Sequence, residues 1–210
     1  MAELSRFWPE TLADHTFLRD RLLEAYDGPG RGYHNRQHLA EVFERIHLIV
    51  ADAAEDLAHD IDLDAVHLAA WFHDAVYRDE GDNEEASARL AERELGLIGA
   101  PHDLVAEVAR LVRVTAGHQV AADDHKGAVL CDADLGILAA DDERYDEYVA
   151  GVRREYAQVP DADFRAGRAI VLRALIDAPA LFRTTYGHEH WEPRARENID
   201  RELARLDPQR

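Results

Sequence analysis

Trp71-Phe72-His73-Asp74-Ala75-Val76-Tyr77 sets a histidine directly beside an aspartate, at the end of an apolar run that begins at Ala65. The run predicts a helix that enters a hydrophobic core. Neighbouring residues of a helix point about 100° apart, so His73 and Asp74 reach one common point only off the edge of the helix. An imidazole nitrogen and a carboxylate oxygen at that point suit a metal ion. The alternative is a helix C-terminus, where His73 meets the helix dipole and Asp74 meets water.

The remainder of the sequence is patterned as helices with short connections. Alanine, leucine, glutamate and arginine are abundant and favour helices, while strand-like alternation is nearly absent. Asn35, Asp82 and Asp141 are predicted N-caps. Further helices are predicted over Pro9 to Tyr26, Asn35 to about Val50, Asp82 to about Gly99, Pro101 to about Gly117, Val129 to Leu138, Asp141 to Tyr156, Phe164 to Ile176 and Glu192 to Leu206. We therefore expect an all-α fold, a single helical domain over residues 1–210 with its core from about 7 to 206.

The composition excludes several classes of partner. The chain has 43 Asp+Glu against 24 Lys+Arg, a net charge of −19 with histidine neutral. Such a surface repels nucleic-acid backbone and anionic lipid, so neither a nucleic-acid duplex nor a membrane is an expected partner. No apolar run reaches the length of a membrane span, the N-terminus resembles no export signal, and Cys131 alone forms no internal disulfide. We expect a cytoplasmic protein and leave its oligomeric state open, a homodimer included.

Polar side chains at the borders of several apolar stripes are candidates to bind one metal ion. They are His38, His73, Asp74 and one of the two aspartates Asp132 and Asp134. A buried charge is costly unless it is paired or coordinates a metal. Two imidazoles and two carboxylates suit Mn, Fe, Co, Ni or Mg and leave coordination positions for water.

The order of these residues resembles the HD-domain superfamily of metal-dependent phosphohydrolases, whose defining pattern is H…HD…D. More narrowly, from about Phe7 to Leu206 the chain resembles the bacterial family labelled predicted metal-dependent HD phosphohydrolase. The motifs that carry the resemblance are Tyr33-His34-Asn35-Arg36-Gln37-His38, Phe72-His73-Asp74, Asn83-Glu84-Glu85, Thr115 with His118, Asp132-Ala133-Asp134-Leu135, Gly167-Arg168 and Trp191-Glu192 with Ala195-Arg196 and Asn198. The resemblance implies an HD-type helical bundle that hydrolyses a nucleotide or another small phosphate ester with a divalent metal ion.

The resemblance also implies roles for the acidic residues. Asp134 matches the superfamily pattern as the fourth metal ligand, beside His38, His73 and Asp74. Asp132, two positions away on a helix, faces another side and is expected to hold neighbouring backbone or an arginine.

Glu84 and Glu85 are the candidate catalytic acid or base. Their alternative role is to stabilise the dipole of a first helical turn.

Five further residues are candidates for binding the substrate. His34, in a glycine-rich loop, either contacts substrate or is solvated, and His118 either binds a second metal, binds phosphate or ends a helix. Arg36, Arg168 and Arg196 are candidate phosphate holders, because a guanidinium grips phosphate in a bidentate manner.

Two other functions stay open from the sequence. One is a non-catalytic nucleotide-binding or regulatory HD protein. The other is an HD-type di-iron oxygenase, which needs further histidine ligands of which only His118 is evident. The glycine-rich stretch from Gly28 to Gly32 lacks the lysine of a phosphate-binding P-loop, so a metal has to supply most of the positive charge at a phosphate.

Overall fold

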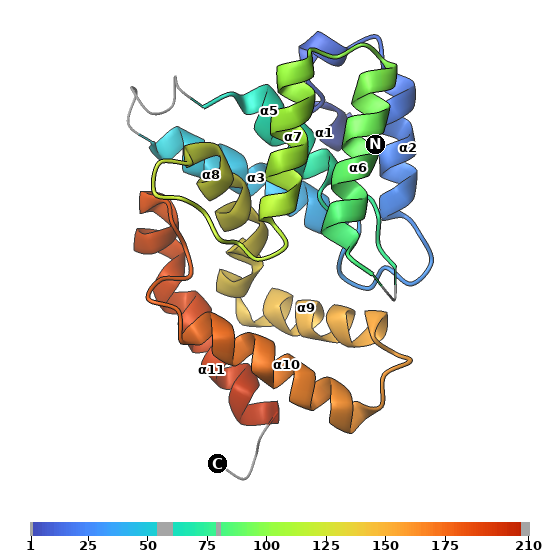
Figure 1. Ribbon diagram of the computed structural model, residues 1–210. Helices are drawn as coiled ribbons and strands as arrows, with labels where there is room; N and C mark the ends of the chain where they lie inside the picture. Colours follow the sequence, from blue (N-terminus) through green and yellow to red (C-terminus); the bar gives the residue numbers. More distant parts are fainter. Residues whose placement is uncertain (1, 54–60, 79–80, 207–210) are drawn as a thin grey trace.

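Helices form all the regular secondary structure in the part of the chain that the computed structural model describes, residues 2–53, 61–78 and 81–206 (Figure 1). The all-α prediction is therefore confirmed for these ranges. The α-helices are α1 (Ala2–Ser5), α2 (Thr16–Tyr26), α3 (Arg36–Asp52), α5 (Leu63–Phe72), α6 (Asn83–Leu97), α7 (His102–Val114), α8 (His125–Leu135), α9 (Asp142–Glu155), α10 (Asp161–Ile176) and α11 (Glu192–Leu206). Two 3₁₀ turns, η1 (Glu10–Leu12) and η2 (Gly136–Ala139), and a π-helical turn, η3 (Gly187–Trp191), complete them. None of the described helices is long and apolar enough to cross a membrane.

The three predicted N-caps begin their helices as expected. The side chain of Asn35 accepts hydrogen bonds from the amides of Gln37 and His38 at 2.9 and 3.3 Å. Asp82 and Asp141 each accept one from the amide three residues on, at 2.8 and 2.9 Å. These bonds satisfy amides that have no partner within the helix. The cap on α3 also fixes the first turn that carries His38.

The predicted helix from Pro9 to Tyr26 is instead broken near its start. The carbonyl of Leu12 accepts a hydrogen bond from the indole of Trp8 at 2.8 Å and from the amide of His15 at 2.9 Å. The Leu12 carbonyl therefore takes part in a turn, and a continuous α-helix does not run through this residue. The break puts the Trp8 ring into the core and lets α2 begin separately.

Two other helices begin earlier than predicted. The segment predicted from Val129 starts four residues sooner as α8, because Asp124 caps it by accepting a hydrogen bond from the Gly127 amide at 3.0 Å. Helix α10 begins directly after Pro160, three residues before the predicted start at Phe164. Proline favours such a boundary, since it has no amide hydrogen to leave unpaired.

A first hydrophobic core is organised by aromatic rings among helices α1 to α8. Phe7 stacks on Phe43 with ring centroids 4.6 Å apart, and Trp8 meets Trp71 edge-on at 5.5 Å. Helices α3, α5 and α8 pack against one another around this core, and α7 packs on α5 and α6 (Figure 1). The three mutually packed helices bring together distant parts of the sequence.

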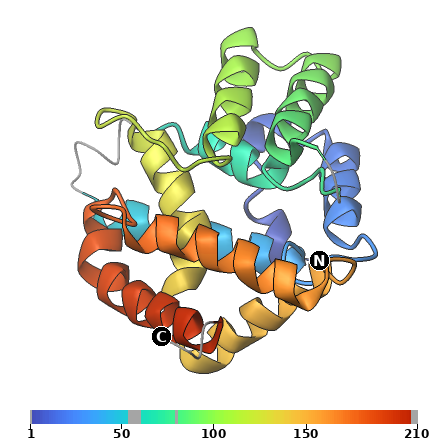
Figure 2. The same cartoon turned by 60° about the horizontal axis from the view of Figure 1, so that its bottom comes forward.

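A second core lies among α9, α10 and α11, in the last third of the chain. Tyr145, Leu172, Phe182 and Ile199 are buried there. Helices α10 and α11 lie side by side in both views (Figure 2). Trp191 packs against both cores, so the two halves share a side chain at their boundary.

A close backbone approach joins the two halves near the start of α3. Gly32, in the loop before this helix, lies against Gly151 of α9. A Cβ atom on Gly151 would lie 2.8 Å from the Gly32 carbonyl oxygen, and one on Gly32 would overlap the Gly151 carbonyl. Both positions therefore need glycine, and the contact sets the spacing between α9 and the loop.

We predict that Gly151→Ala lowers the free energy of unfolding by about 1–3 kcal/mol, because the added methyl group forces two backbones apart. Chemical denaturation monitored by circular dichroism measures the change. Gly167→Ala, on α10, is the matched control, because no atom outside its own helix lies within 4 Å of a Cβ there. We expect it to leave stability unchanged or raise it by up to about 1 kcal/mol. Equal stability of Gly151→Ala and wild type would contradict the packing described.

Candidate metal centre

Two buried histidines from different helices face each other where α3 and α5 meet. Nε2 of His38 lies 3.0 Å from Nε2 of His73, and both side chains are at most 1 % exposed. Nδ1 of His73 lies 2.8 Å from the carbonyl oxygen of Ala70, one turn back in the same helix. That carbonyl only accepts hydrogen bonds, so Nδ1 carries the proton and Nε2 of a neutral His73 presents a lone pair. Nδ1 of His38 is buried and has no partner among the described residues, so its polar neighbours all lie on the Nε2 side.

Two aspartates complete the cluster on its more exposed side. Oδ2 of Asp74 lies 3.3 Å from His38 Nε2 and 3.1 Å from His73 Nε2. Oδ1 of Asp134, near the end of α8, lies 3.3 and 3.7 Å from the same two nitrogens. The hydroxyl of Tyr26 accepts a hydrogen bond from the Asp74 amide at 3.3 Å and thereby fixes the backbone after α5. The adjacent pair His73 and Asp74 thus converges on one point, just past the end of the helix.

The charges in this cluster favour a positive centre. Burial alone would lower the pKa of His73, but the carboxylate of Asp74, together with Tyr26 and Asp134, outweighs this effect and the pKa lies well above its usual value. Burial likewise acts to raise the pKa of Asp74 and of Asp134, yet the neighbouring histidines hold both pKa values well below the usual one. In the described part no lysine or arginine forms an ion pair with either carboxylate. A cation bound here would therefore compete with a proton for the site.

The spacing of the donor atoms suits a divalent ion. Adjacent ligands of an octahedral ion with bonds of about 2.1 Å lie about 3.0 Å apart. The separations between His38, His73 and Asp74 run from 3.0 to 3.3 Å, close to that value. Ligand atoms of these three residues all lie within 4.8 Å of one another, and Asp134 adds a fourth donor beside the histidines. The residues therefore fit a divalent metal ion, whose identity the donor set leaves open.

His34 is held beside the cluster by a carboxylate that the sequence did not reveal. Glu155, at the end of α9, accepts hydrogen bonds at 2.8 Å from the amides of Tyr33 and His34 and from Nδ1 of His34. Tyr77 donates its hydroxyl to the same carboxylate at 3.0 Å, and its ring stacks on His34. Glu155 lies 121 residues from His34 on an ordinary amphipathic helix, so only the fold could have indicated its role.

The pKa of His34 is raised by this environment. Burial by itself would lower the pKa, but the charges of Asp74, Glu155 and Asp134 and the hydrogen bond that Nδ1 of His34 donates to Glu155 together outweigh it. The His34 and His38 rings lie 5.6 Å apart, which places His34 at the edge of the metal-ligand cluster. With Nδ1 directed to Glu155, Nε2 is the nitrogen left to contact a substrate.

His118 contacts the cluster through Asp134. Its Nε2 lies 3.0 Å from Oδ2 of Asp134, the oxygen other than the one nearest the two buried histidines. His118 is also the one described residue other than glycine with a positive φ, 50°. A left-handed backbone is uncommon outside glycine and is often found where function constrains a residue. The structure thus places His118 beside the cluster. Asp134 has His38 and His73 as neighbours on one oxygen and His118 on the other.

Asp132 does not face the cluster. It is 1 % exposed and accepts hydrogen bonds from the amides of Arg183 and Thr184 at 2.7–2.9 Å and from the Thr184 hydroxyl at 2.7 Å. It therefore anchors the segment before the π-helical turn η3. The helical reasoning that separated Asp132 from Asp134 agrees with this geometry.

The two candidate catalytic glutamates lie in the first turn of α6. Glu85 pairs with Arg89 at 2.8 Å and with Arg113 at 2.6 Å, and hydrogen bonds from these arginines lower its pKa to about 2. A carboxylate with so low a pKa is poorly suited to proton transfer near neutral pH. The contacts of Glu85 with Arg89 and Arg113 are structural. Catalytic roles for Glu84 and Glu85 remain predictions.

The three arginines predicted to hold phosphate are engaged by protein groups. Arg36 pairs with Asp27 and donates to the Leu23 carbonyl. Arg168 is bound to Glu202 and Tyr148, and Arg196 to Glu192 and the carbonyls of Ile176 and Ala178. No contact among the described residues joins any of the three to the metal-ligand cluster. In this structure the three arginines connect separate parts of the chain through these contacts. Their binding of phosphate stays a prediction.

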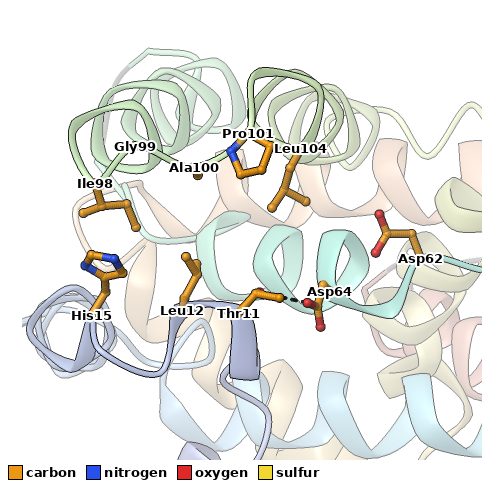
Figure 3. Close-up of a pocket in the computed structure, with 10 residues that line it drawn as sticks. All are labelled: Thr11, Leu12, His15, Asp62, Asp64, Ile98, Gly99, Ala100, Pro101 and Leu104. Atoms are coloured by element: carbon orange, nitrogen blue, oxygen red, sulfur yellow. Dashed lines mark hydrogen bonds between the residues drawn. The ribbon is translucent and has the colours of Figure 1, made fainter.

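A separate pocket of about 280 Å³ is drawn in Figure 3 with the residues that line it. Its walls come from η1, from the start of α5 and from the connection between α6 and α7, and Thr11 donates a hydrogen bond to Asp64 within the wall at 2.9 Å. None of the predicted site residues lines it. The predicted metal ligands lie together in the histidine and aspartate cluster instead.

No protein-family model, curated protein or solved structure matches the chain.

We predict opposite outcomes for Asp134→Asn and Asp132→Asn. Asp134→Asn should lose bound metal while keeping the helical circular dichroism signal, because it removes a charged donor at the cluster. Asp132→Asn should keep the metal but lose about 1–3 kcal/mol of unfolding free energy, because an amide group cannot accept all the hydrogen bonds from Arg183 and Thr184. Elemental analysis and chemical denaturation measure the two effects. Metal loss in Asp132→Asn with full occupancy in Asp134→Asn would reverse the assignment.

Proposed function

We propose that this protein is a metal-dependent phosphohydrolase that acts on a nucleotide or another small phosphate ester. The observation that most supports the proposal is the meeting of two imidazole nitrogens and two carboxylate oxygens, 3.0 to 3.7 Å apart, from helices α3 and α8 and the end of α5. His38, His73, Asp74 and Asp134 would hold the ion. When bound, a divalent ion supplies a Lewis acid for the phosphoryl oxygens and acidifies a coordinated water. Mn, Mg, Co, Ni and Fe all suit this donor set.

His34 is the chain's own candidate for proton transfer. Its Nδ1 is oriented by Glu155 as a catalytic histidine is oriented by a carboxylate in other hydrolases, which leaves Nε2 to face the reacting group. The lowered pKa of Glu155, which His34 and the two backbone amides hold down against the effect of burial, keeps this carboxylate ionised. A protonated His34 is then able to bind a phosphoryl oxygen or to protonate a leaving group.

The acidic character of the chain also limits the substrate. A phosphate ester approaches a protein of net charge −19 only where positive charge is concentrated. The cluster concentrates it, since a cation and His34 would lie side by side there. A small phosphorylated substrate, with neither a nucleic-acid duplex nor a membrane as partner, is part of the proposal.

The contact between His118 and Asp134 supports a second candidate, a two-metal centre. One oxygen of Asp134 faces the buried histidines and the other faces His118, and a carboxylate so placed is able to bridge two ions. An HD-type di-iron oxygenase would need this arrangement. Two irons per chain, with one lost in His118→Ala, would favour it. Stoichiometric metal with nucleotide binding and no turnover would instead favour a regulatory protein.

We predict that the purified protein hydrolyses small phosphate esters only with added divalent metal and that a chelator abolishes the activity. The reason is that the charge needed at the phosphoryl group comes from the ion. A screen of metal ions against a panel of phosphate esters measures the dependence. Full activity in metal-free protein would contradict the proposal.

We predict that His34→Asn lowers kcat by about 10²–10⁴-fold, the usual range for loss of an acid or base, while the metal content stays at the wild-type level. His102→Asn is the matched control, because the His102 side chain is 96 % exposed. Steady-state kinetics and elemental analysis on the same preparations separate catalysis from metal binding. An unchanged kcat in His34→Asn would remove His34 from the mechanism.

A further inference from the structure

A second cavity adjoins the metal centre and is lined with positive charge. It has a volume of about 640 Å³, within the range of small-molecule sites. Its walls are the Gly28–Arg31 turn, the segment Ala75–Arg78 that follows Asp74, and the end of α9 with residues 157 and 158 beyond it. Arg31, Arg78 and Arg154 all line it.

Arg31 is fixed in place by carbonyl groups and aromatic rings, and none of its contacts with the described residues is an ion pair with a carboxylate. Its guanidinium donates to the carbonyl of His34 at 2.7 Å and to that of Ala75 at 3.2 Å. It also lies over the rings of Tyr26 and Tyr77, 5.0 and 5.3 Å from their centroids. A guanidinium has five N–H donors, so two carbonyl contacts leave others for a ligand.

The three arginines differ from most others in this acidic protein. Arg6, Arg45, Arg110, Arg144 and Arg168, for example, all pair with carboxylates. Within the described ranges, Arg31, Arg78 and Arg154 form no ion pair with a carboxylate, and Arg154 donates instead to the carbonyl of Gly32 at 3.2 Å.

The one carboxylate in the cavity wall is already satisfied. Glu155 accepts hydrogen bonds from two backbone amides, from His34 and from Tyr77, and it forms no ion pair with an arginine among the described residues. The cavity therefore gathers three arginines that have no carboxylate partner in the described part of a chain whose net charge is −19.

We propose that this cavity binds a second, non-reacting phosphate group of the substrate. The inference rests on the proposed function and narrows it to small esters that carry two phosphate groups at separate positions. The cavity lies beside the metal centre, since Ala75 of its wall directly follows Asp74 and Tyr77 comes three residues after Asp74. Tyr77 also stacks on His34 with centroids 4.8 Å apart. Guanidinium groups bind phosphate through paired, charge-assisted hydrogen bonds.

The binding test uses inorganic phosphate and metal-free protein, so it is independent of hydrolysis. Isothermal titration calorimetry compares wild type with the double variant Arg78→Gln/Arg154→Gln. These two arginines are chosen because, apart from the hydrogen bond from Arg154 to the Gly32 carbonyl, their side chains make few contacts with the described residues. We expect the double variant to raise the Kd by about tenfold or more, because charge-assisted hydrogen bonds are lost. Arg205→Gln is the control, since Arg205 is an exposed arginine that pairs with Asp146 and does not line the cavity.

Three results would overturn the proposal. They are no phosphate binding by wild type at millimolar concentration, equal affinity in wild type and the double variant, and an equal loss of affinity in Arg205→Gln. The last would show a general charge effect and not a site.

Turnover separates this proposal from the function on which it rests. With metal present, the double variant should raise KM about tenfold for an ester with two phosphates and leave KM for p-nitrophenyl phosphate unchanged. Absence of all hydrolysis would count against the proposed function, whereas the phosphate titration would still decide the cavity. An equal change in KM for both substrates would contradict a site for a second phosphate.

Discussion

The 3.0 Å approach of the His38 and His73 imidazoles is the contact on which the account of this protein depends. Two buried imidazoles next to two carboxylates cost free energy unless a cation or a network of protons and hydrogen bonds compensates them. The mutual packing of α3, α5 and α8 holds the side chains together despite that cost. The apolar residues of these helices thus supply the stability that the polar cluster requires.

The second half of the chain contributes to the site through Glu155 of α9, which binds the residues just before α3. Helix α9 reaches the loop before α3 through the close approach of Gly32 and Gly151, and this contact sets Glu155 under the amides of Tyr33 and His34. Gly32 of that loop serves backbone packing against α9, and the loop has no lysine of a phosphate-binding P-loop. The same loop also forms one wall of the arginine-lined cavity. The position of His34 therefore depends on both hydrophobic cores.

Sequence patterns over a few residues correctly predicted the features that depend on short-range interactions, such as helix caps and the side of a helix that a residue faces. The caps Asn35 and Asp82 follow from hydrogen bonds within a few residues, and the separation of Asp132 from Asp134 follows from helical periodicity. The role of Glu155 depends on a contact between elements far apart in the sequence, for which one chain carries no pattern. Arginines posed the same difficulty: Arg168 was a candidate for phosphate, yet Glu202 binds it, and only the fold distinguishes paired from unpaired guanidinium groups.

The central claim is that His38, His73, Asp74 and Asp134 bind one divalent ion between them. A crystal of protein prepared with Mn²⁺ or Co²⁺, measured at the absorption edge of that metal, tests the claim most directly. The account predicts an anomalous difference peak within about 2.0–2.3 Å of both Nε2 atoms and of an oxygen from each aspartate. The claim would be contradicted if a crystal that contains the metal showed no anomalous peak between the two histidines, or showed peaks only at other sites.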